Sequence, residues 1–180
     1  MLFSPALTSQ KDLAKIEIRH LRKTELPELE WEGEYIHFRP MFERAYRRVE
    51  TGEAVIWVAA LQNKLLGQVF VQLRSGRNEL VDGHTRAYLY AIRVRETFRN
   101  LGLGSRLMFV TENDLIWRGY RFSTLNVARE NLDGLRFYER HGYKIVGEDD
   151  GRWSYTDHLG QTHLVHEPAY RMEKALKLGR

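Results

Sequence analysis

Three consecutive runs of strand-forming residues most constrain what this chain can fold into. They read AVIWVAAL at residues 54–61, LLGQVFVQL at 65–73 and TRAYLYAIRV at 85–94. The short turn at 62–64 joins the first two runs, which predicts an antiparallel pair, and the third run extends the pair into a meander. The first run is almost continuously apolar, so we expect it to be buried on both faces.

Two helices with apolar stripes are expected to cover this sheet. Pro40 fits the first turn of a helix through MFERAYRRVE, and Gly52 follows the end of that helix. A second helix is predicted from Gly104 to Arg118, where apolar residues recur along one face before Gly119. The remaining expected elements are strands at 15–21, 121–127, 143–149 and 169–176 and a short helix at 131–141.

The order of these elements predicts an α+β (mixed α/β) fold, with helices on both faces of a central mixed sheet. The chain has 180 residues, with no internal repeat and no low-complexity linker, so we expect a single domain over residues 1–180. Residues 1–14 are expected to form a loose N-terminal arm. Residues 151–168 are expected to form a long polar connection that carries Trp153 and Tyr155.

Composition narrows the class of protein. The absence of cysteine excludes disulfides, thiolate metal sites and cysteine nucleophiles. No apolar run reaches the ~18 residues of a membrane span, and the N-terminus lacks a signal-peptide pattern, so we expect a cytoplasmic protein that does not associate with membranes. The net charge of +4 is a mild bias toward anionic partners. It lacks the clustered excess of a nucleic-acid-binding protein, so no nucleic-acid partner is expected.

The segment RNLGLGS at 99–105 lies between a predicted strand and a predicted helix. It fits either a tight turn or an anion site. The first amides of a helix carry the positive end of its dipole, and Gly102 and Gly104 would let a phosphate approach bare backbone. Arg99 and Arg106 would add positive charge, and Ser105 would add a hydroxyl donor.

Other motif classes do not fit the sequence. The Walker pattern lacks its Gly-Lys-Ser/Thr, and the dinucleotide fingerprint would need a third glycine where Leu107 stands. No metal is expected. The group of residues that most resembles a metal site does not follow a zinc-binding spacing: His158, His163, His166 and Glu167. Three arginines are interpreted as the solvated face of a helix rather than as a nucleic-acid patch: Arg44, Arg47 and Arg48.

Two spaced motifs resemble those of the GNAT superfamily of acyl-CoA-dependent N-acetyltransferases. The family's pyrophosphate loop, Arg/Gln-x-x-Gly-x-Gly/Ala, is matched by RNLGLG at 99–104. A later family pattern, Asn-x-x-Ala-x-x-x-Tyr-x-x-x-Gly-Phe/Tyr, is matched in spacing from Asn131 to Tyr143, with Gly134 where alanine is usual. The run YRMEKAL also resembles the family's last strand. The resemblance covers residues 15–176 in element order and 86–147 in motif.

The resemblance implies a GNAT-like fold, whose mostly antiparallel sheet of about six to seven strands is splayed in the middle. It also implies acetyl-CoA as the cofactor. The pantetheine arm would pair with the backbone near Ile92 and Val94, and Asn131 would bond the pantetheine or the thioester end. The diphosphate would lie on the hinge segment, which consists of Arg99, Asn100, Leu101, Gly102, Leu103, Gly104 and Ser105.

The reaction that the resemblance implies is direct transfer of the acetyl group to a primary amine of a small molecule or peptide. A backbone amide near Val94 would hold the oxyanion. Tyr138 matches the family's general acid, and a phenol with a pKa near about 10 suits protonation of a departing thiolate. Without the motif, Tyr138 would be interpreted as a core aromatic residue of an amphipathic helix.

The sequence defines the base and the acceptor site less well. Family members that acetylate ribosomal-protein N-termini often carry a glutamate where this chain has Asn126, which cannot act as a base. Four other candidate bases are equally typical of a solvated surface: Glu30, Glu34, His37 and His84. The acceptor site is expected to involve Trp31, Tyr35, Phe38, Tyr88 and Asn126. Trp153 and Tyr155 are interpreted either as lining its other wall or as cross-strand partners in a hairpin. These aromatic residues favour a compact, partly apolar acceptor.

Two other functions stay open at this point. A catalytically silent acyl-CoA-binding regulatory module would keep the phosphate turn but lack a base. A basic nucleic-acid-binding module would leave the two spaced motifs unexplained. The sequence also leaves open whether the protein forms a homodimer.

Overall fold

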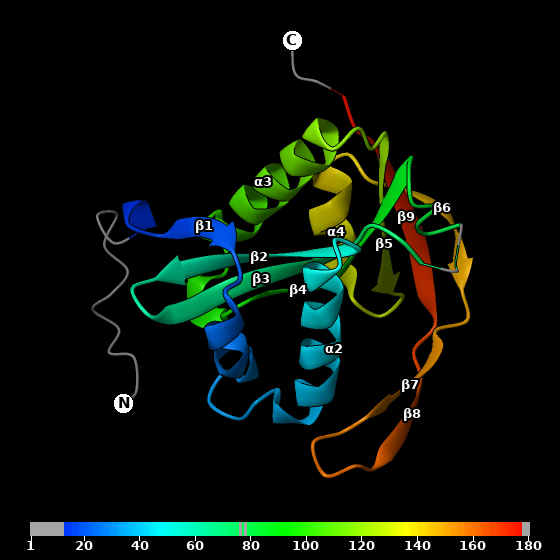
Figure 1. The fold of residues 1–180 in the computed structure, drawn as a ribbon. Helices are drawn as coiled ribbons and strands as arrows, with labels where there is room; N and C mark the ends of the chain where they lie inside the picture. The colour runs from blue at the N-terminus through cyan, green and yellow to red at the C-terminus, as the bar shows by residue number, and fades with distance from the viewer. Residues whose placement is uncertain (1–12, 76, 78, 178–180) are drawn as a thin grey trace.

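A seven-stranded mixed sheet forms the centre of the computed structural model, which describes residues 13–75, 77 and 79–177 (Figure 1). The strand order is β1-β2-β3-β4-β5-β9-β6. β4 and β5 run parallel, and the other neighbouring strands are antiparallel. The prediction of a mostly antiparallel mixed sheet is therefore confirmed. The strands are β1 (Glu17–His20), β2 (Ala54–Leu61), β3 (Lys64–Gln72), β4 (Arg86–Val94), β5 (Phe122–Ala128), β6 (Lys144–Asp149) and β9 (Ala169–Ala175).

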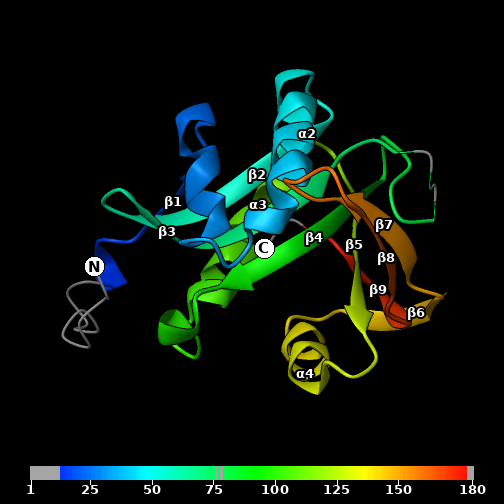
Figure 2. The same ribbon diagram turned by 90° about the horizontal axis from the view of Figure 1, so that it is seen from below.

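Helices cover both faces of this sheet, as the apolar run of β2 requires (Figure 2). Val55 and Ala59 of β2 belong to the core under α3, whereas Ile56 and Val58 belong to the core under α2. Alternation of side chains along the strand divides the run between the two cores. The helices on the first face are α3 (Leu103–Trp117) and α4 (Leu132–Arg140), and those on the second are η2 (Lys23–Glu30), η3 (Ile36–Phe38) and α2 (Arg39–Glu50).

The sheet is splayed between β4 and β5. Their pairing runs from Arg86 opposite Phe122 to Leu89 opposite Leu125 and stops there, although β4 continues to Val94. Figure 2 shows the two strands pointing apart. Beyond Leu89, the edge of β4 that faces β5 therefore has no strand partner among the described residues.

Two features bend β4 away from β5. Ala91 has a positive φ of 48°, and the β3–β4 register shifts between Gln68 and Phe70, which marks a bulge. Gly67 of β3 lies opposite Val94, and a Cβ added there would meet the Arg93 carbonyl oxygen at 3.0 Å. Glycine at 67 thus permits the close approach of the two strands where β4 bends.

The segment at 151–168, expected to be a long polar connection, contains regular structure. It forms a two-stranded hairpin of β7 (Arg152–Thr156) and β8 (Thr162–His166), with Trp153 opposite Val165 and Tyr155 opposite His163. The hairpin pairs with itself rather than with the main sheet, and most of its residues are exposed or half-buried. A strand pair without a buried face lacks the apolar alternation from which strands are predicted.

Other expected boundaries shift by a few residues. The first strand covers 17–20 rather than 15–21, and most of the expected arm, residues 1–12, lies outside the described residues. None of the helices in the described part of the chain combines the length and apolarity needed to cross a membrane.

Asp82 fixes the chain where it enters β4. Its Oδ1 accepts hydrogen bonds from the backbone N–H groups of His84, Thr85 and Arg86 at 3.0, 2.7 and 2.8 Å, and the Thr85 hydroxyl donates to Oδ2. Burial opposes ionisation of this carboxyl, but the four donors outweigh burial and hold its pKa well below the ordinary value.

Replacing Asp82 with alanine is expected to lower the free energy of unfolding by about 2 kcal/mol, because hydrogen bonds to a charged group are the strong ones. The folded-state pKa lies below the unfolded one, so this stabilisation is present above about pH 4 and is lost as the pH falls through the folded-state pKa. Urea unfolding at neutral and at acidic pH should show the difference between the two proteins shrinking in acid. Glu43→Ala, at an exposed position of α2, is the control and should cost less than about 0.5 kcal/mol.

Candidate active site

The hinge between β4 and α3 has the geometry of an anion site. A short 3-10 turn, η4 (Glu96–Phe98), leads to Gly102, which is the N-cap of α3 with a φ of 77°. The first bond along the helix runs from the Arg106 N–H to the Gly102 oxygen at 3.0 Å. The amides of residues 103–105 therefore have no partner within the helix. A Cβ at Gly102 would meet no atom within 4 Å, so the N-cap position itself is open to solvent.

The side chains of the hinge segment differ in their exposure to solvent. Arg99 and Asn100 are exposed, and Arg99 Nε donates to the Val94 carbonyl oxygen at 3.1 Å, which keeps its charge beside the hinge. Leu101 is exposed, whereas Leu103 is buried in the core. Arg106, expected to add positive charge, is held by backbone carbonyls. Its guanidinium donates to the carbonyls of residues 13 and 16 at 3.2 and 3.0 Å and ties down the N-terminal segment.

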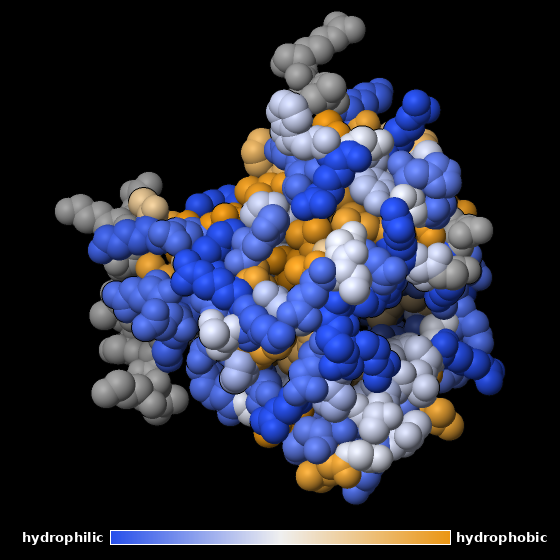
Figure 3. Space-filling model, viewed as in Figure 1, coloured by the Kyte–Doolittle hydropathy of each residue, from blue (hydrophilic) through white to orange (hydrophobic). Residues whose placement is uncertain are grey.

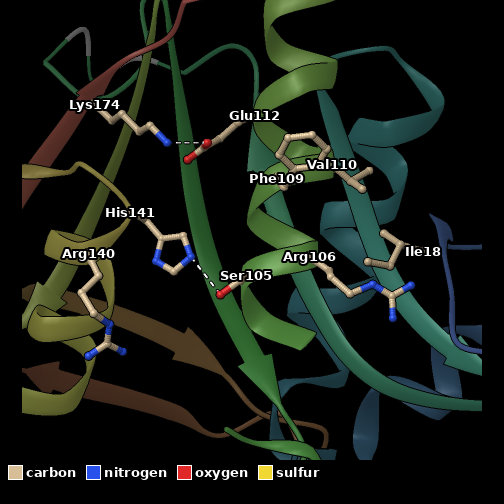
Figure 4. A pocket seen from close by; sticks show the side chains of 9 residues that line it. All are labelled: Ile18, Ser105, Arg106, Phe109, Val110, Glu112, Arg140, His141 and Lys174. Atoms are coloured by element: carbon tan, nitrogen blue, oxygen red, sulfur yellow. Dashed lines mark hydrogen bonds and ion pairs between the residues drawn. The ribbon is translucent and has the colours of Figure 1, made fainter. Parts of the chain in front are cut away.

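A cavity of about 760 Å3 lies between α3, α4 and β1, and we call it the α3–α4 cavity (Figure 4). Ser105 reaches it from the hinge and is hydrogen-bonded to His141 Nε2 at 3.0 Å. Arg106 and Arg140 also line it, so the cavity carries positive charge next to the open amides. The sequence analysis missed Arg140 and His141, although a basic pair directly before the helix-ending Gly142 was the available signal.

Tyr138 lies on α4 and packs edge-to-face against Phe137 and Tyr143, at ring distances of 5.3 and 5.9 Å. No hydrogen bond joins its hydroxyl to any described residue. Burial raises the pKa of Tyr138 well above the ordinary value, and the neighbouring Tyr88 raises it further. The phenol therefore stays protonated at neutral pH. Ile92 of β4 packs against the same core as Tyr138.

Asn131 caps α4, because its Oδ1 accepts a hydrogen bond from the Gly134 N–H at 2.9 Å. This cap explains the glycine at 134, where the family pattern has alanine. A Cβ at 134 would lie 2.6 Å from Asn131 Nδ2, so the side chain could not fold over the first turn as it does here. The cap uses the oxygen of the amide and leaves Nδ2 available.

A second cavity, of about 500 Å3, lies on the other face of the sheet, between α2 and the ends of β4 and β5, and we call it the α2 cavity. Figure 3 shows a hollow beside α2 on this face, with hydrophilic residues around its rim. Of the residues expected at the acceptor site, Phe38, Tyr88 and Asn126 line the cavity. Trp31 is buried beneath Arg95 and does not line it.

Tyr35 also lies outside the α2 cavity but contacts one of its lining residues, because the guanidinium of Arg93 lies 4.1 Å from its ring centre. Trp153, expected either on a wall of the acceptor site or in a hairpin, lies on β7 and lines the cavity. Three further lining residues, from β4, β6 and the loop before β4, lie outside the sequence predictions: Arg93, Asp149 and Arg77.

Asp149 holds the charged side of the α2 cavity together. Its Oδ2 accepts from Arg77 Nη2 at 2.5 Å and from Asn126 Nδ2 at 3.0 Å, and its Oδ1 accepts from the Gly151 N–H at 2.8 Å. Burial opposes its ionisation, but these partners, Arg77 first, hold the pKa of Asp149 below the ordinary value. Burial raises the pKa of Tyr88, on the same wall, to about 12.

The four candidate bases do not line the α2 cavity. Glu30 is paired with Arg39 at 2.6 Å, and Glu34 and His84 are exposed. His37 packs against Phe38 and Tyr155, where burial and the charge of Arg93 lower its pKa. The carboxylates that do line the cavity are Asp149 and Glu167. Among the described residues, no group of three or more potential ligands could hold a metal ion.

Comparisons with known proteins agree with this geometry. The model of the acetyltransferase (GNAT) family matches residues 16–143. A curated relative, the 5-NmdU N-acetyltransferase of Pseudomonas phage PaMx11, is 36% identical over 63 residues, which are 35% of this chain and 43% of that protein. The match thus spans less than half the length of the curated relative.

Solved structures share the fold at low sequence identity. Ard1 from Thermoplasma volcanium has a TM-score of 0.68 at 17% identity, over 91% of this chain and 99% of its own. Arabidopsis thaliana NAA60 in complex with acetyl-CoA has a TM-score of 0.68 at 21% identity, over 89% and 98%. The ribosomal-protein-S18-alanine N-acetyltransferase of Escherichia coli has a TM-score of 0.67 at 19% identity, over 92% and 96%. With its splayed sheet, its open helix N-terminus and a family model that matches well over half of its length, the chain belongs to the GNAT family of acetyltransferases.

Proposed function

We propose that the protein transfers an acetyl group from acetyl-CoA to a primary amine of a small molecule or peptide. The observation that carries this proposal is the position of the open amides of residues 103–105. They follow the end of β4, where the sheet parts, and Ser105 of the same turn lines the α3–α4 cavity. Residues of β4 and β5 beside the gap line the α2 cavity. A carrier held on one face can present its thioester through the gap to an amine on the other face.

In this proposal the hinge and the α3–α4 cavity hold the cofactor. The diphosphate lies on the amides of residues 101–105, with the charge of Arg99 and the exposed amide of Asn100 beside it. Arg140 and His141 bring positive charge and a ring nitrogen to the same side. The pantetheine pairs with β4 at residues 92–94, whose edge toward β5 has no described strand partner, and Asn131 Nδ2 donates to it.

The acetyl transfer then proceeds in one displacement. The amine nitrogen attacks the thioester carbonyl carbon, a C–N bond forms, and negative charge gathers on the carbonyl oxygen near the Val94 amide. The C–S bond breaks, and Tyr138 gives its proton to the departing thiolate. The amine proton leaves to Asp149 or Glu167, the carboxylates that line the α2 cavity. The names of the relatives, which include a 5-NmdU acetyltransferase and a ribosomal-protein acetyltransferase, support an amine as the acceptor.

Gly102→Ala is expected to weaken binding of coenzyme A about tenfold, or about 1.4 kcal/mol, because a side chain at a φ of 77° strains the turn and stands before the amides. Gly119→Ala is a matched control. Gly119 ends α3 with a φ of 88° and also has open space around it, so it carries the same strain without the anion site. Calorimetry with coenzyme A measures both. Equal affinities in the two variants would place the diphosphate elsewhere.

Tyr138→Phe is expected to lower kcat about 100-fold while leaving the affinity for acetyl-CoA within about twofold, since general acid catalysis contributes two or more orders of magnitude. Because the pKa of Tyr138 is raised, the wild-type rate should show no loss of this acid below about pH 10. Release of free thiol reports the turnover.

Tyr120→Phe is the control for this experiment. It removes a hydroxyl that donates to the Leu73 carbonyl at 3.1 Å and lines neither cavity. If Tyr138→Phe turns over as fast as the wild-type protein, Tyr138 is not the general acid. Binding of acetyl-CoA without turnover of any amine by the wild-type protein would favour the silent acyl-CoA-binding module instead.

A further inference from the structure

Two residues that line the α2 cavity each carry a buried polar atom without a hydrogen-bond partner among the described residues. The atoms are Arg93 Nη1, a donor, and Asn126 Oδ1, an acceptor. Buried polar atoms are nearly always hydrogen-bonded. A ligand in the cavity would supply an acceptor to the first and a donor to the second once the two side chains turn toward it.

Arg93 is held in place by aromatic rings rather than by an acid. Its guanidinium carbon lies 4.1 Å from the ring centre of Tyr35 and 5.3 Å from that of Phe38. Stacking of this kind fixes the plane of a guanidinium and leaves its N–H edge free for a planar anion. Burial lowers the pKa of Arg93, and the nearby Tyr35 and Glu34 only partly oppose this shift.

Unlike neighbouring arginines, Arg93 has no acidic partner among the described residues. Arg39 is paired with Glu30 at 2.6 Å, and Arg95 is paired with Glu32 at 2.7 Å. No ion pair joins Arg93 to an acid in the described part of the chain. A buried cation without a counter-ion is costly unless a ligand brings the opposite charge.

The charge of the whole α2 cavity favours the same kind of ligand. Five arginines line it against two carboxylates. Three of the arginines are paired with acids: Arg77 with Asp149 at 2.5 Å, Arg48 with Glu53 at 3.4 Å and Arg152 with Asp150 at 2.6 Å. No ion pair joins Arg44 or Arg93 to an acid among the described residues, so the concave surface keeps a positive excess that favours an anion. The lining arginines are Arg44, Arg48, Arg77, Arg93 and Arg152.

Asn126 faces the other end of such a ligand. Its Nδ2 donates to the Asp149 carboxylate at 3.0 Å, and because a carboxylate can only accept, this bond fixes the orientation of the amide. Oδ1 is left to accept a hydrogen bond. Asn126 follows Leu125, the last residue of β5 that pairs with β4, so it stands where the sheet begins to part.

We infer that the acceptor is an amine that carries an anionic group, a carboxylate or a phosphate, on the same molecule. The anion binds the N–H edge of Arg93, and the amine donates an N–H to Asn126 Oδ1 beside the gap between β4 and β5. Aromatic residues, Phe38, Tyr90 and Trp153, wall the space between these two ends. This inference rests on the proposed acetyl transfer and narrows its substrate class.

The test compares acceptors that differ only in the anion. One pair is 4-(aminomethyl)benzoate and 4-(aminomethyl)benzamide, and the other is 4-(aminomethyl)phenyl phosphate and 4-(aminomethyl)phenol. We expect the anionic member of at least one pair to have a kcat/KM about tenfold or more above its neutral partner, as loss of a charged hydrogen bond implies. The pair that shows the larger preference identifies a carboxylate or a phosphate.

Arg93→Met keeps the length of the side chain and removes its charge. It should abolish the preference for the anion, so that kcat/KM falls about tenfold or more further for the anionic member of a pair than for its neutral partner. Arg47→Met is the matched control, since Arg47 is an exposed arginine of α2 that does not line the cavity. It should retain the preference. Equal kcat/KM values within both pairs, or a preference that survives in Arg93→Met, would overturn the inference.

A binding measurement separates this inference from the proposed function. If none of the amines is acetylated, the proposed function fails, and thermal unfolding with benzoate or phenyl phosphate, in the presence of coenzyme A, then decides the anion site. Stabilisation of the wild-type protein that is absent in Arg93→Met supports the site. No stabilisation of the wild-type protein overturns it.

Discussion

The loss of pairing between β4 and β5 after Leu89 is the constraint on which the site depends. β4 keeps its bonds to β3 to the end, because Gly67 admits the bent strand and the bulge at Ala91 absorbs the change of register. The splay leaves part of the β4 edge in the middle of the sheet without a strand partner among the described residues. That edge lies directly before the hinge, so a strand defect and an open helix N-terminus adjoin each other.

The two faces of the sheet divide the chemistry. On the α3 and α4 face, unpaired amides and the basic residues Arg99, Arg140 and His141 suit a phosphorylated carrier. On the α2 face, stacked and paired arginines surround a cavity with aromatic walls. Tyr138 lies on α4, on the first face, and is close enough to Tyr88 of β4 to link that face with the gap. Burial raises the pKa of Tyr138, and Tyr88 raises it further.

Much of the fold could be predicted from the sequence, because its elements have strong local signals. The continuous apolar run of β2, the helix stops at Gly52 and Gly119 and the spaced motifs each depend on residues close together in the chain. The sequence leaves the hairpin of β7 and β8 as only one of two interpretations of Trp153 and Tyr155, since the hairpin buries no regular face. Asp149, Arg77 and Arg93 come from three separate parts of the fold and line one cavity. The hydrogen bond from Arg106 to the N-terminal segment likewise depends on where the fold places that segment. Long-range register determines such contacts, and a single sequence does not encode it locally.

The hairpin has a consequence for how this enzyme could diversify. It contributes Trp153 and Arg152 to the α2 cavity. Its two strands pair only with each other, and the seven-stranded sheet is formed without them. Insertions or exchanges in this hairpin would reshape the proposed acceptor wall and leave unchanged the hinge that is proposed to hold acetyl-CoA. Selection for a new amine would then act on a part of the chain that the main sheet does not need.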